Sequence, residues 1–236
     1  MTVLATNQTF APIATIPILE QGDCLSRVEF ERRYGAMRGV KKAELIEGVV
    51  HMPSPVRFNH HADPHADLMT WLGVYRANSP GIRIADNVSV RLDLENEPQP
   101  DAVMFIDPAC GGNVTISDDD YVVGAPELVA EVAASSVSID LNAKLRVYRR
   151  NQVREYLVWR VQDQAFDWFV LRQEQYERLA PNAAGTLESP TFPGLWLDPA
   201  ALLRADLAVV LRTLQRGIDT PAHLEFVGRL QAKISS

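Results

Sequence analysis

The chain has 236 residues, of which 47% are apolar and 22% charged, and its net charge is -7. This is the composition of a globular protein with enough material for a sizeable core, and it excludes a protein that grips nucleic acid through overall positive charge. The two cysteines form no C-x-x-C pair, which excludes a zinc ribbon and a thioredoxin-type site. No apolar run approaches the roughly 20 residues of a membrane span, and the first residues lack a signal-peptide pattern. We therefore expect a cytoplasmic protein with reduced thiols.

Residues 1–21 show little periodicity and are expected to form a loose N-terminal arm. Segments of helical spacing and segments of strand-like alternation follow, with Pro and Gly between them. Helices are predicted from 25 (with Ser26 as its cap) and over 65–77, 141–150, 199–214 and 223–234, and strands over 43–50, 82–94, 101–106, 128–133, 155–161, 165–171 and 176–179. This order predicts an α/β domain over 22–200, with a mixed central sheet flanked by helices, and a C-terminal helical extension over 201–236.

Two acidic residues stand in predicted apolar strands. Asp101 opens one of them, and Glu131 lies in the middle of another. Because side chains alternate along a strand, Glu131 shares a face with Val129 and Ala133. Both faces of that strand are apolar, so we expect the strand to be central and Glu131 to point into a covered region. A carboxylate there must be paired, protonated or bound to a cation, which leaves a structural acid and a metal ligand as the two interpretations.

Lys144 lies in the helix predicted after Glu131. A rotation of about 100° per residue puts it on one face with Leu141, Leu145 and Tyr148, inside the apolar stripe that packs on the sheet. The alternative interpretation of Lys144 is that its stem packs on apolar surface while its ammonium reaches water. Two carboxylates on neighbouring strands would suit Mg²⁺ or Mn²⁺, and an ammonium beside them would stabilise charge on a phosphate. The set indicates phosphodiester hydrolysis.

The same helix carries the local positive charge that the whole chain lacks. Arg146, Arg149 and Arg150 lie close together and are candidates for contact with DNA phosphates. The alternative is a solvated helix face, above all for Arg149 and Arg150.

Three histidines, His60, His61 and His65, are also close in the sequence. His61 and His65 have the spacing of zinc ligands on a helix. Pro64 lies between them, however, and is expected to prevent a continuous helix across both. We therefore expect His65 in the first turn of a helix near the mouth of the site, and a histidine-based zinc hydrolase is a weaker hypothesis.

Several short motifs, taken in order and with their spacing, resemble the putative restriction endonuclease family of the PD-(D/E)XK nuclease superfamily, long catalogued as a domain of unknown function. The resemblance runs from about residue 25 to 205. The matching stretches are ELIEGVV at 44–50, PD at 100–101, PELVAEV at 126–132 with SS at 135–136, DLNAK at 140–144 with Tyr148, VREYLVW at 153–159 and FPGL at 192–195.

The resemblance implies a restriction-endonuclease-like fold and a metal site on Asp101 and Glu131. Glu47 matches the early glutamate that often completes this site, and Glu44 is an alternative of lower rank. The superfamily's lysine, two residues after the glutamate, is Ala133 here. In families like this one the following helix is thought to supply that lysine, which would be Lys144.

The leading hypothesis is therefore an endonuclease that uses Mg²⁺ or Mn²⁺ to cut DNA. Restriction-type nucleases often pair, so a homodimer is expected, with the C-terminal residues as a possible contact. The alternative is a catalytically inactive protein of the same fold that acts as a binding or scaffolding module. The acidic net charge and Ala133 favour that alternative.

Overall fold

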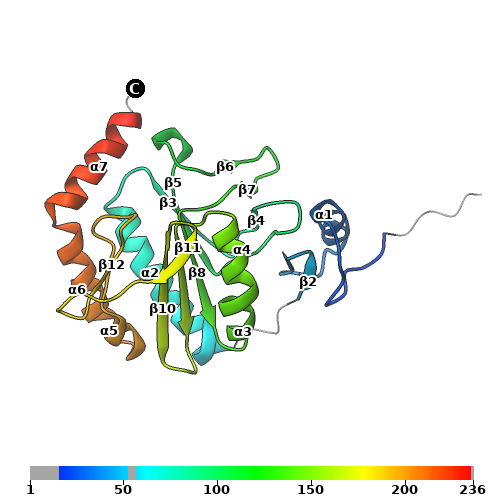
Figure 1. The fold of residues 1–236 in the computed structure, drawn as a ribbon, viewed down its shortest axis with the longest axis horizontal. Helices are drawn as coiled ribbons and strands as arrows, with labels where there is room; N and C mark the ends of the chain where they lie inside the picture. Colours follow the sequence, from blue (N-terminus) through cyan, green and yellow to red (C-terminus); the bar gives the residue numbers. More distant parts are fainter. Residues whose placement is uncertain (1–15, 53–56, 235–236) are drawn as a thin grey trace, which may run out of the picture.

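The computed structural model describes residues 16–52 and 57–234, so most of the predicted N-terminal arm lies outside the described residues. The elements are labelled in Figure 1. The α-helices are α1 (Arg27–Ala36), α2 (Asp63–Ala77), α3 (Val137–Ile139), α4 (Leu145–Arg150), α5 (Pro199–Leu203), α6 (Leu207–Ile218) and α7 (Pro221–Ile234), and the π- and 3-10 helices are η1 (Phe58–Ala62), η2 (Pro108–Cys110) and η3 (Asp140–Lys144). The strands are β1 (Glu44–Ile46), β2 (Val49–His51), β3 (Ile82–Asp86), β4 (Val90–Arg91), β5 (Ala102–Ile106), β6 (Thr115–Ile116), β7 (Val122–Val123), β8 (Leu128–Ala133), β9 (Glu155–Arg160), β10 (Ala165–Arg172), β11 (Gln175–Arg178), β12 (Leu187–Glu188) and β13 (Trp196–Leu197).

The centre of the molecule is a six-stranded sheet in the order β11-β10-β9-β8-β5-β3. Strands β8 and β9 run parallel, and the other neighbours are antiparallel, so the sheet is mixed as predicted. Every residue of β8 is buried, which fits its predicted central place. Helix α2 covers one face of the sheet, and the continuous helical segment η3–α4 covers the other (Figure 1).

The side chains of β8 divide between two cores, as strand alternation predicts. Leu128, Ala130 and Val132 pack in the core that contains the buried residues of α2. Val129 and Ala133 pack in the other core, with Tyr148 of α4. Glu131 therefore faces the helical segment that carries Lys144.

Two predicted elements are each split into two. The strand predicted over 82–94 ends at Asp86, because Asn87 has a left-handed backbone (φ 49°), and β4 then joins a separate small sheet with β6 and β7. The helix predicted over 199–214 is divided into α5 and α6 by Ala205 (φ 57°), after which the side chain of Asp206 caps α6. A left-handed residue cannot continue either a strand or an α-helix.

The backbone is helical across Pro64, so the expected break between His61 and His65 is wrong. The π-turn η1 runs directly into α2, and the main-chain N–H of Asp63 bonds the carbonyl of Phe58. Pro64 thereby falls in the first turn of α2, a position at which helices tolerate proline. Both histidines consequently lie on one helical segment.

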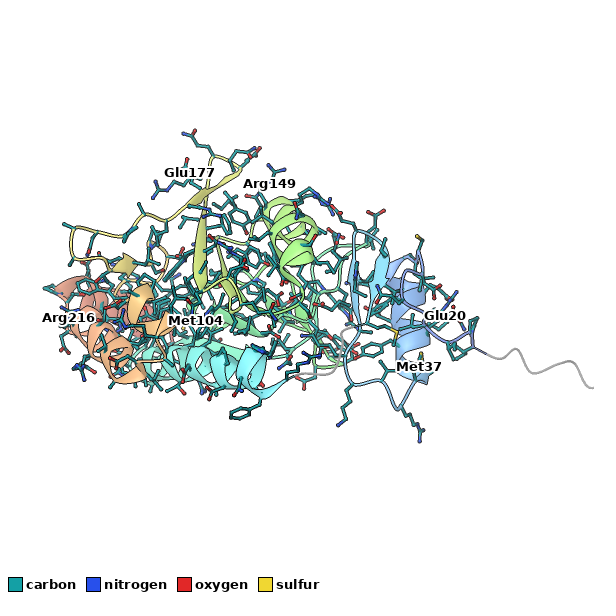
Figure 2. All side chains as sticks on the ribbon, turned by 90° about the horizontal axis from the view of Figure 1, so that it is seen from below. Glu20, Met37, Met104, Arg149, Glu177 and Arg216 are labelled. Carbon is teal, nitrogen blue, oxygen red and sulfur yellow. The ribbon has the colours of Figure 1, made fainter. Side chains whose placement is uncertain are left out.

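The N-terminal segment forms a small unit at one end of the molecule, where Glu20 and Met37 are labelled in Figure 2; Arg216 marks the opposite end. Helix α1, which the side chain of Ser26 caps as predicted, packs on the β1–β2 hairpin over its own small core. The hairpin is attached to the body by two main-chain hydrogen bonds between Leu45 and Glu97 (2.8 and 3.1 Å). This attachment fixes the position of Glu44, the neighbour of Leu45.

Helices α6 and α7 pack on the same core as α2. They contribute to that core the side chains of Val210, Leu214, Ile218, Phe226 and Leu230. Within the described ranges, none of the helices has the length and apolar character needed to span a bilayer.

Substituting Glu97 is expected to change how stability depends on pH. Burial, followed by the neighbouring Glu31, raises the pKa of Glu97 to about 8. A carboxyl whose pKa is higher in the folded than in the unfolded chain stabilises the fold below the unfolded pKa, and this contribution is lost as pH rises toward 8. In Glu97→Gln this loss should disappear. The free energy of unfolding, measured with urea at about pH 5 and pH 9, should then change less with pH than in the parent, by about a few kcal/mol. Equal pH slopes for both proteins would contradict this.

Candidate functional site

Asp101 and Glu131 face each other across two neighbouring strands. The antiparallel pairing of β5 and β8 aligns Ala102 with Ala130, so the next pair in this register is Asp101 and Glu131. Residues directly opposite in an antiparallel pair have Cβ atoms about 4.5–5.5 Å apart and point to the same face. The main-chain N–H of Val132 also donates to Asp101 Oδ2 (2.8 Å), which ties the aspartate to β8. The structure therefore brings together the two acids predicted to bind metal.

The Asp101 carboxylate is buried and has two further polar neighbours, and a third polar group contacts the main chain of Asp101. Lys42 Nζ lies 3.2 Å from Oδ1, and His61 Nε2 lies 3.2 Å from Oδ2. His65 Nε2 lies 2.8 Å from the main-chain oxygen of Asp101. Burial opposes ionisation, but the contacts with His61 and Lys42 outweigh it and hold the pKa of Asp101 below its usual range. Asp101 is thus a carboxylate at neutral pH, paired with Lys42 and His61.

Lys144 is buried among three carboxylates. Its Nζ lies 2.9 Å from Glu131 Oε1, 2.9 Å from Glu44 Oε1 and 3.6 Å from Asp140 Oδ1. The predicted helix face is confirmed, but the alternative of an ammonium that reaches water is wrong, since Lys144 is only 4% exposed. Burial opposes its charge, yet Glu131, Glu44 and Asp140 raise the pKa of Lys144 well above normal. It is a cation fixed inside the protein.

Glu131 is a buried acid whose pKa is raised. Its Oε1 accepts hydrogen bonds from Lys144 (2.9 Å) and from the Tyr148 hydroxyl (3.0 Å). Burial is the main cause that raises the pKa of Glu131 to about 8; Lys144 opposes the rise, while Asp140, Asp101 and Glu44 add to it. An additional cation next to Glu131 would relieve this accumulation of negative charge.

The structure does not bring Glu47 to this group. Glu47 lies in the turn between β1 and β2 (φ 52°), half-buried, and its carboxylate pairs with Arg146 at 2.7 and 3.1 Å. Glu44, at the start of β1, is the hairpin glutamate that contacts Lys144; its carboxylate also accepts the main-chain N–H of Gln99 (2.8 Å). Of these two acids three residues apart, the alternative of lower rank, Glu44, lies in the group, and the leading choice, Glu47, lies outside it.

The three arginines predicted to contact DNA lie on the outer surface of α4. Arg146 is engaged with Glu47, Arg149 donates to the side chain of Gln175 (2.6 Å), and Arg150 lies 3.7 Å from Asp93. Figure 2 shows Arg149 at the outer edge of the molecule. Their contact with DNA stays a prediction.

We call the four carboxylates of Glu44, Asp101, Glu131 and Asp140 the acidic cluster. They meet two ammonium groups, those of Lys42 and Lys144, so full ionisation of all four acids would leave negative charge in excess, and burial raises the pKa of Glu131 and Asp140 accordingly. Oxygen ligands with excess negative charge suit a hard divalent cation, and Mg²⁺ commonly uses one or two carboxylates with water in its other positions. Within residues 16–52 and 57–234, no three side chains of His, Cys, Asp or Glu are grouped closely enough to hold a metal by themselves. The residues therefore fit a cation held by Asp101 and Glu131 with water, and they do not form a closed zinc site.

Lys42 and Asp140 belong to the site but were not among the predicted residues. Asp140 is four residues before Lys144 on the same helical segment, and this i,i+4 spacing is the sequence signal that could have identified it. Lys42 precedes Glu44 by two residues, and two such residues share a face in extended chain. Nothing in the sequence indicates that this face meets Asp101.

A fold of this class, with a central mixed sheet flanked by helices, is also found in a crystal structure of a putative nuclease belonging to DUF820 from Anabaena variabilis. The TM-score is 0.51 at 14% identity, over 79% of this chain and 97% of that chain. The predicted fold class is confirmed. The family model of Uma2, described as putative restriction endonuclease, matches residues 27–200, and the chain belongs to this family, as the motifs predicted. No curated protein matches the chain.

Proposed function

We propose that this protein is a divalent-metal-dependent endonuclease that hydrolyses phosphodiester bonds in DNA. The observation that carries the proposal is the pair of Asp101, directly before β5, and Glu131 of β8, which lie opposite each other in the register of these strands and belong to a buried acidic cluster. Membership of the Uma2 family supports the reaction class.

In this proposal Asp101 and Glu131 hold Mg²⁺ or Mn²⁺. Such a cation, when bound, lowers the pKa of a coordinated water and offsets negative charge on a phosphate. During hydrolysis the water oxygen bonds to phosphorus, the bond from phosphorus to the leaving sugar oxygen breaks, and a proton from the water ends on that oxygen. Lys144 keeps Glu131 and Glu44 in place through its 2.9 Å contacts. The basic surface of α4 is proposed to meet the DNA backbone.

Titration with Mn²⁺ by calorimetry tests the metal site directly. We expect binding to the parent and loss of binding in Glu131→Ala. Glu47→Ala is the matched control, because this glutamate of the neighbouring hairpin turn contacts Arg146 and not the acidic cluster. The control should bind as the parent does. Binding that survives in Glu131→Ala would contradict the site, even if the protein cuts DNA.

A second candidate function is a catalytically inactive module of the same fold. It is favoured by the contacts of Asp101, whose two carboxylate oxygens already meet Lys42, His61 and the N–H of Val132. It predicts no Mn²⁺ binding in the parent and no cleavage with any divalent cation. The same titration therefore separates the two functions.

A further inference from the structure

The two lysines of the site differ in what they can reach. The Lys144 side chain is 5% exposed, and its ammonium already meets three carboxylates. Glu131 and Glu44 lie at hydrogen-bond distance from this ammonium, and Asp140, at 3.6 Å, attracts its charge without a hydrogen bond. A phosphate that arrived from solvent would have to displace Glu131 or Glu44 to reach it. Lys144 is therefore well placed to position carboxylates and poorly placed to contact a substrate.

Lys42 lies on the open side of the same cluster. Its side chain is 24% exposed, and its Nζ lies 3.2 Å from Asp101 Oδ1 and 3.3 Å from Asn87 Oδ1. His61, which meets the other carboxylate oxygen of Asp101, is 21% exposed. Lys42 and His61 thus form the solvent-facing edge around a carboxylate that is itself only 5% exposed. A group that approaches Asp101 from solvent meets this edge first.

We propose that Lys42 is the catalytic residue that contacts the scissile phosphate of DNA, and that Lys144 is a positioning residue for Glu131 and Glu44. This assignment rests on the proposed function. The Lys42 ammonium would stabilise the negative charge that develops on the non-bridging phosphate oxygens, and it transfers no proton. The role that the motifs gave to Lys144 is then divided between two lysines from different parts of the chain, Lys42 just before β1 and Lys144 at the end of η3.

The position of Lys42 also gives the assignment a signature other than activity. Its ammonium contacts Oδ1 of Asp101, and the proposed function gives the carboxylate of Asp101 to the divalent cation. The two cations therefore compete for that carboxylate. Removal of Lys42 should therefore tighten metal binding, whereas removal of a residue that merely supports the fold would weaken it. The flexible four-carbon stem of lysine allows its ammonium to turn to a phosphate beside Asp101.

The test compares the parent with Lys42→Met and Lys42→Arg, with Lys41→Met as the matched control. Lys41 is the exposed neighbour, one residue away. Each protein is first checked for the parent's unfolding midpoint. Three quantities are then measured: Mn²⁺ affinity by calorimetry, the rate of cleavage of a labelled DNA duplex with Mn²⁺, and the affinity for that duplex in EDTA as salt is varied.

In Lys42→Met we expect cleavage at least about 100-fold slower, because one charge-stabilising donor is lost. Mn²⁺ affinity should rise about tenfold, and the slope of log affinity against log salt should fall by about one, as for the loss of one phosphate contact. Lys42→Arg should keep part of the activity, and Lys41→Met should match the parent in cleavage and Mn²⁺ affinity.

The outcomes separate the two proposals. If the parent cleaves DNA and Lys42→Met cleaves it at the same rate, the assignment of Lys42 is overturned and the nuclease proposal stands. If Lys42→Met cleaves more slowly and also binds Mn²⁺ more weakly, the assignment of Lys42 is overturned as well, since Lys42 would then support the metal site. A parent that neither binds Mn²⁺ nor cleaves DNA overturns the proposed function, and the assignment falls with it.

Discussion

Replacing Lys144 with methionine is expected to lower the free energy of unfolding by about 3–5 kcal/mol, because loss of one partner leaves buried charge without compensation. Glu131 and Glu44 would each lose a contact of 2.9 Å. In the variant the pKa of Glu131 would rise further above its unfolded value. A carboxyl with a raised folded pKa loses its stabilising contribution as pH increases, so the deficit should be larger at about pH 9 than at pH 6.

Urea unfolding followed by circular dichroism measures this effect, with Lys41→Met as an exposed control. The double variant Lys144→Met with Glu131→Gln should recover part of the loss, because it removes one of the stranded charges and keeps an acceptor for the Tyr148 hydroxyl. A single variant as stable as the parent would mean that the ion pairs around Lys144 contribute nothing. Its role as a positioning residue would then be untenable.

Short-range sequence patterns predict those residues of the site that lie on regular strands and helices. Period-two alternation gave the face of Glu131 on β8, and helical rotation gave the buried face of Lys144. Both results follow from local geometry, because a strand or a helix fixes where each side chain points once the element exists. Their meeting at 2.9 Å follows in turn from the packing of the η3–α4 segment on the β8 face.

The contribution of the hairpin could not be predicted in the same way. Glu44 and Glu47 are both acids in one short motif, and which of them faces the sheet depends on where β1 ends and on the attachment of Leu45 to Glu97. The left-handed residues Glu47 and Gly48 (φ 52° and 74°) form the turn and direct Glu47 toward Arg146. These are long-range contacts, between residues about 50 and 100 positions apart, which no local period encodes.

The histidines show a different limit of sequence-based prediction, because the rule that proline interrupts a helix depends on where in the helix the proline lies. Proline is tolerated in the first turn of an α-helix, and α2 begins at Asp63, directly after the π-turn η1. His61 therefore reaches the Asp101 carboxylate, where sequence reasoning had separated it from His65. A wide helical turn is rare and has no simple sequence signature, but such turns are frequent at functional sites.

Replacing Asp101 with alanine is expected to abolish Mn²⁺ binding and to slow metal-dependent DNA cleavage by at least about 1000-fold. The reason is that several kcal/mol of charge stabilisation in the transition state depend on the bound cation. The substitution also leaves the buried N–H of Val132 without its acceptor, which should cost about 1–3 kcal/mol of stability. The variant should still fold, since Ala102 and Val103 of β5 keep their pairing with β8.

Asp101→Asn separates the loss of charge from the loss of the acceptor. Its amide oxygen can still accept the N–H of Val132, so its unfolding midpoint should lie closer to that of the parent, while cleavage should stay as low as in the alanine variant. Asp86→Ala is the matched control, because Asp86 pairs with Ala102 in the neighbouring strand and is exposed. Cleavage by Asp101→Asn at the parent's rate would exclude Asp101 from the reaction, because a metal ligand cannot lose its charge without losing affinity for a hard cation.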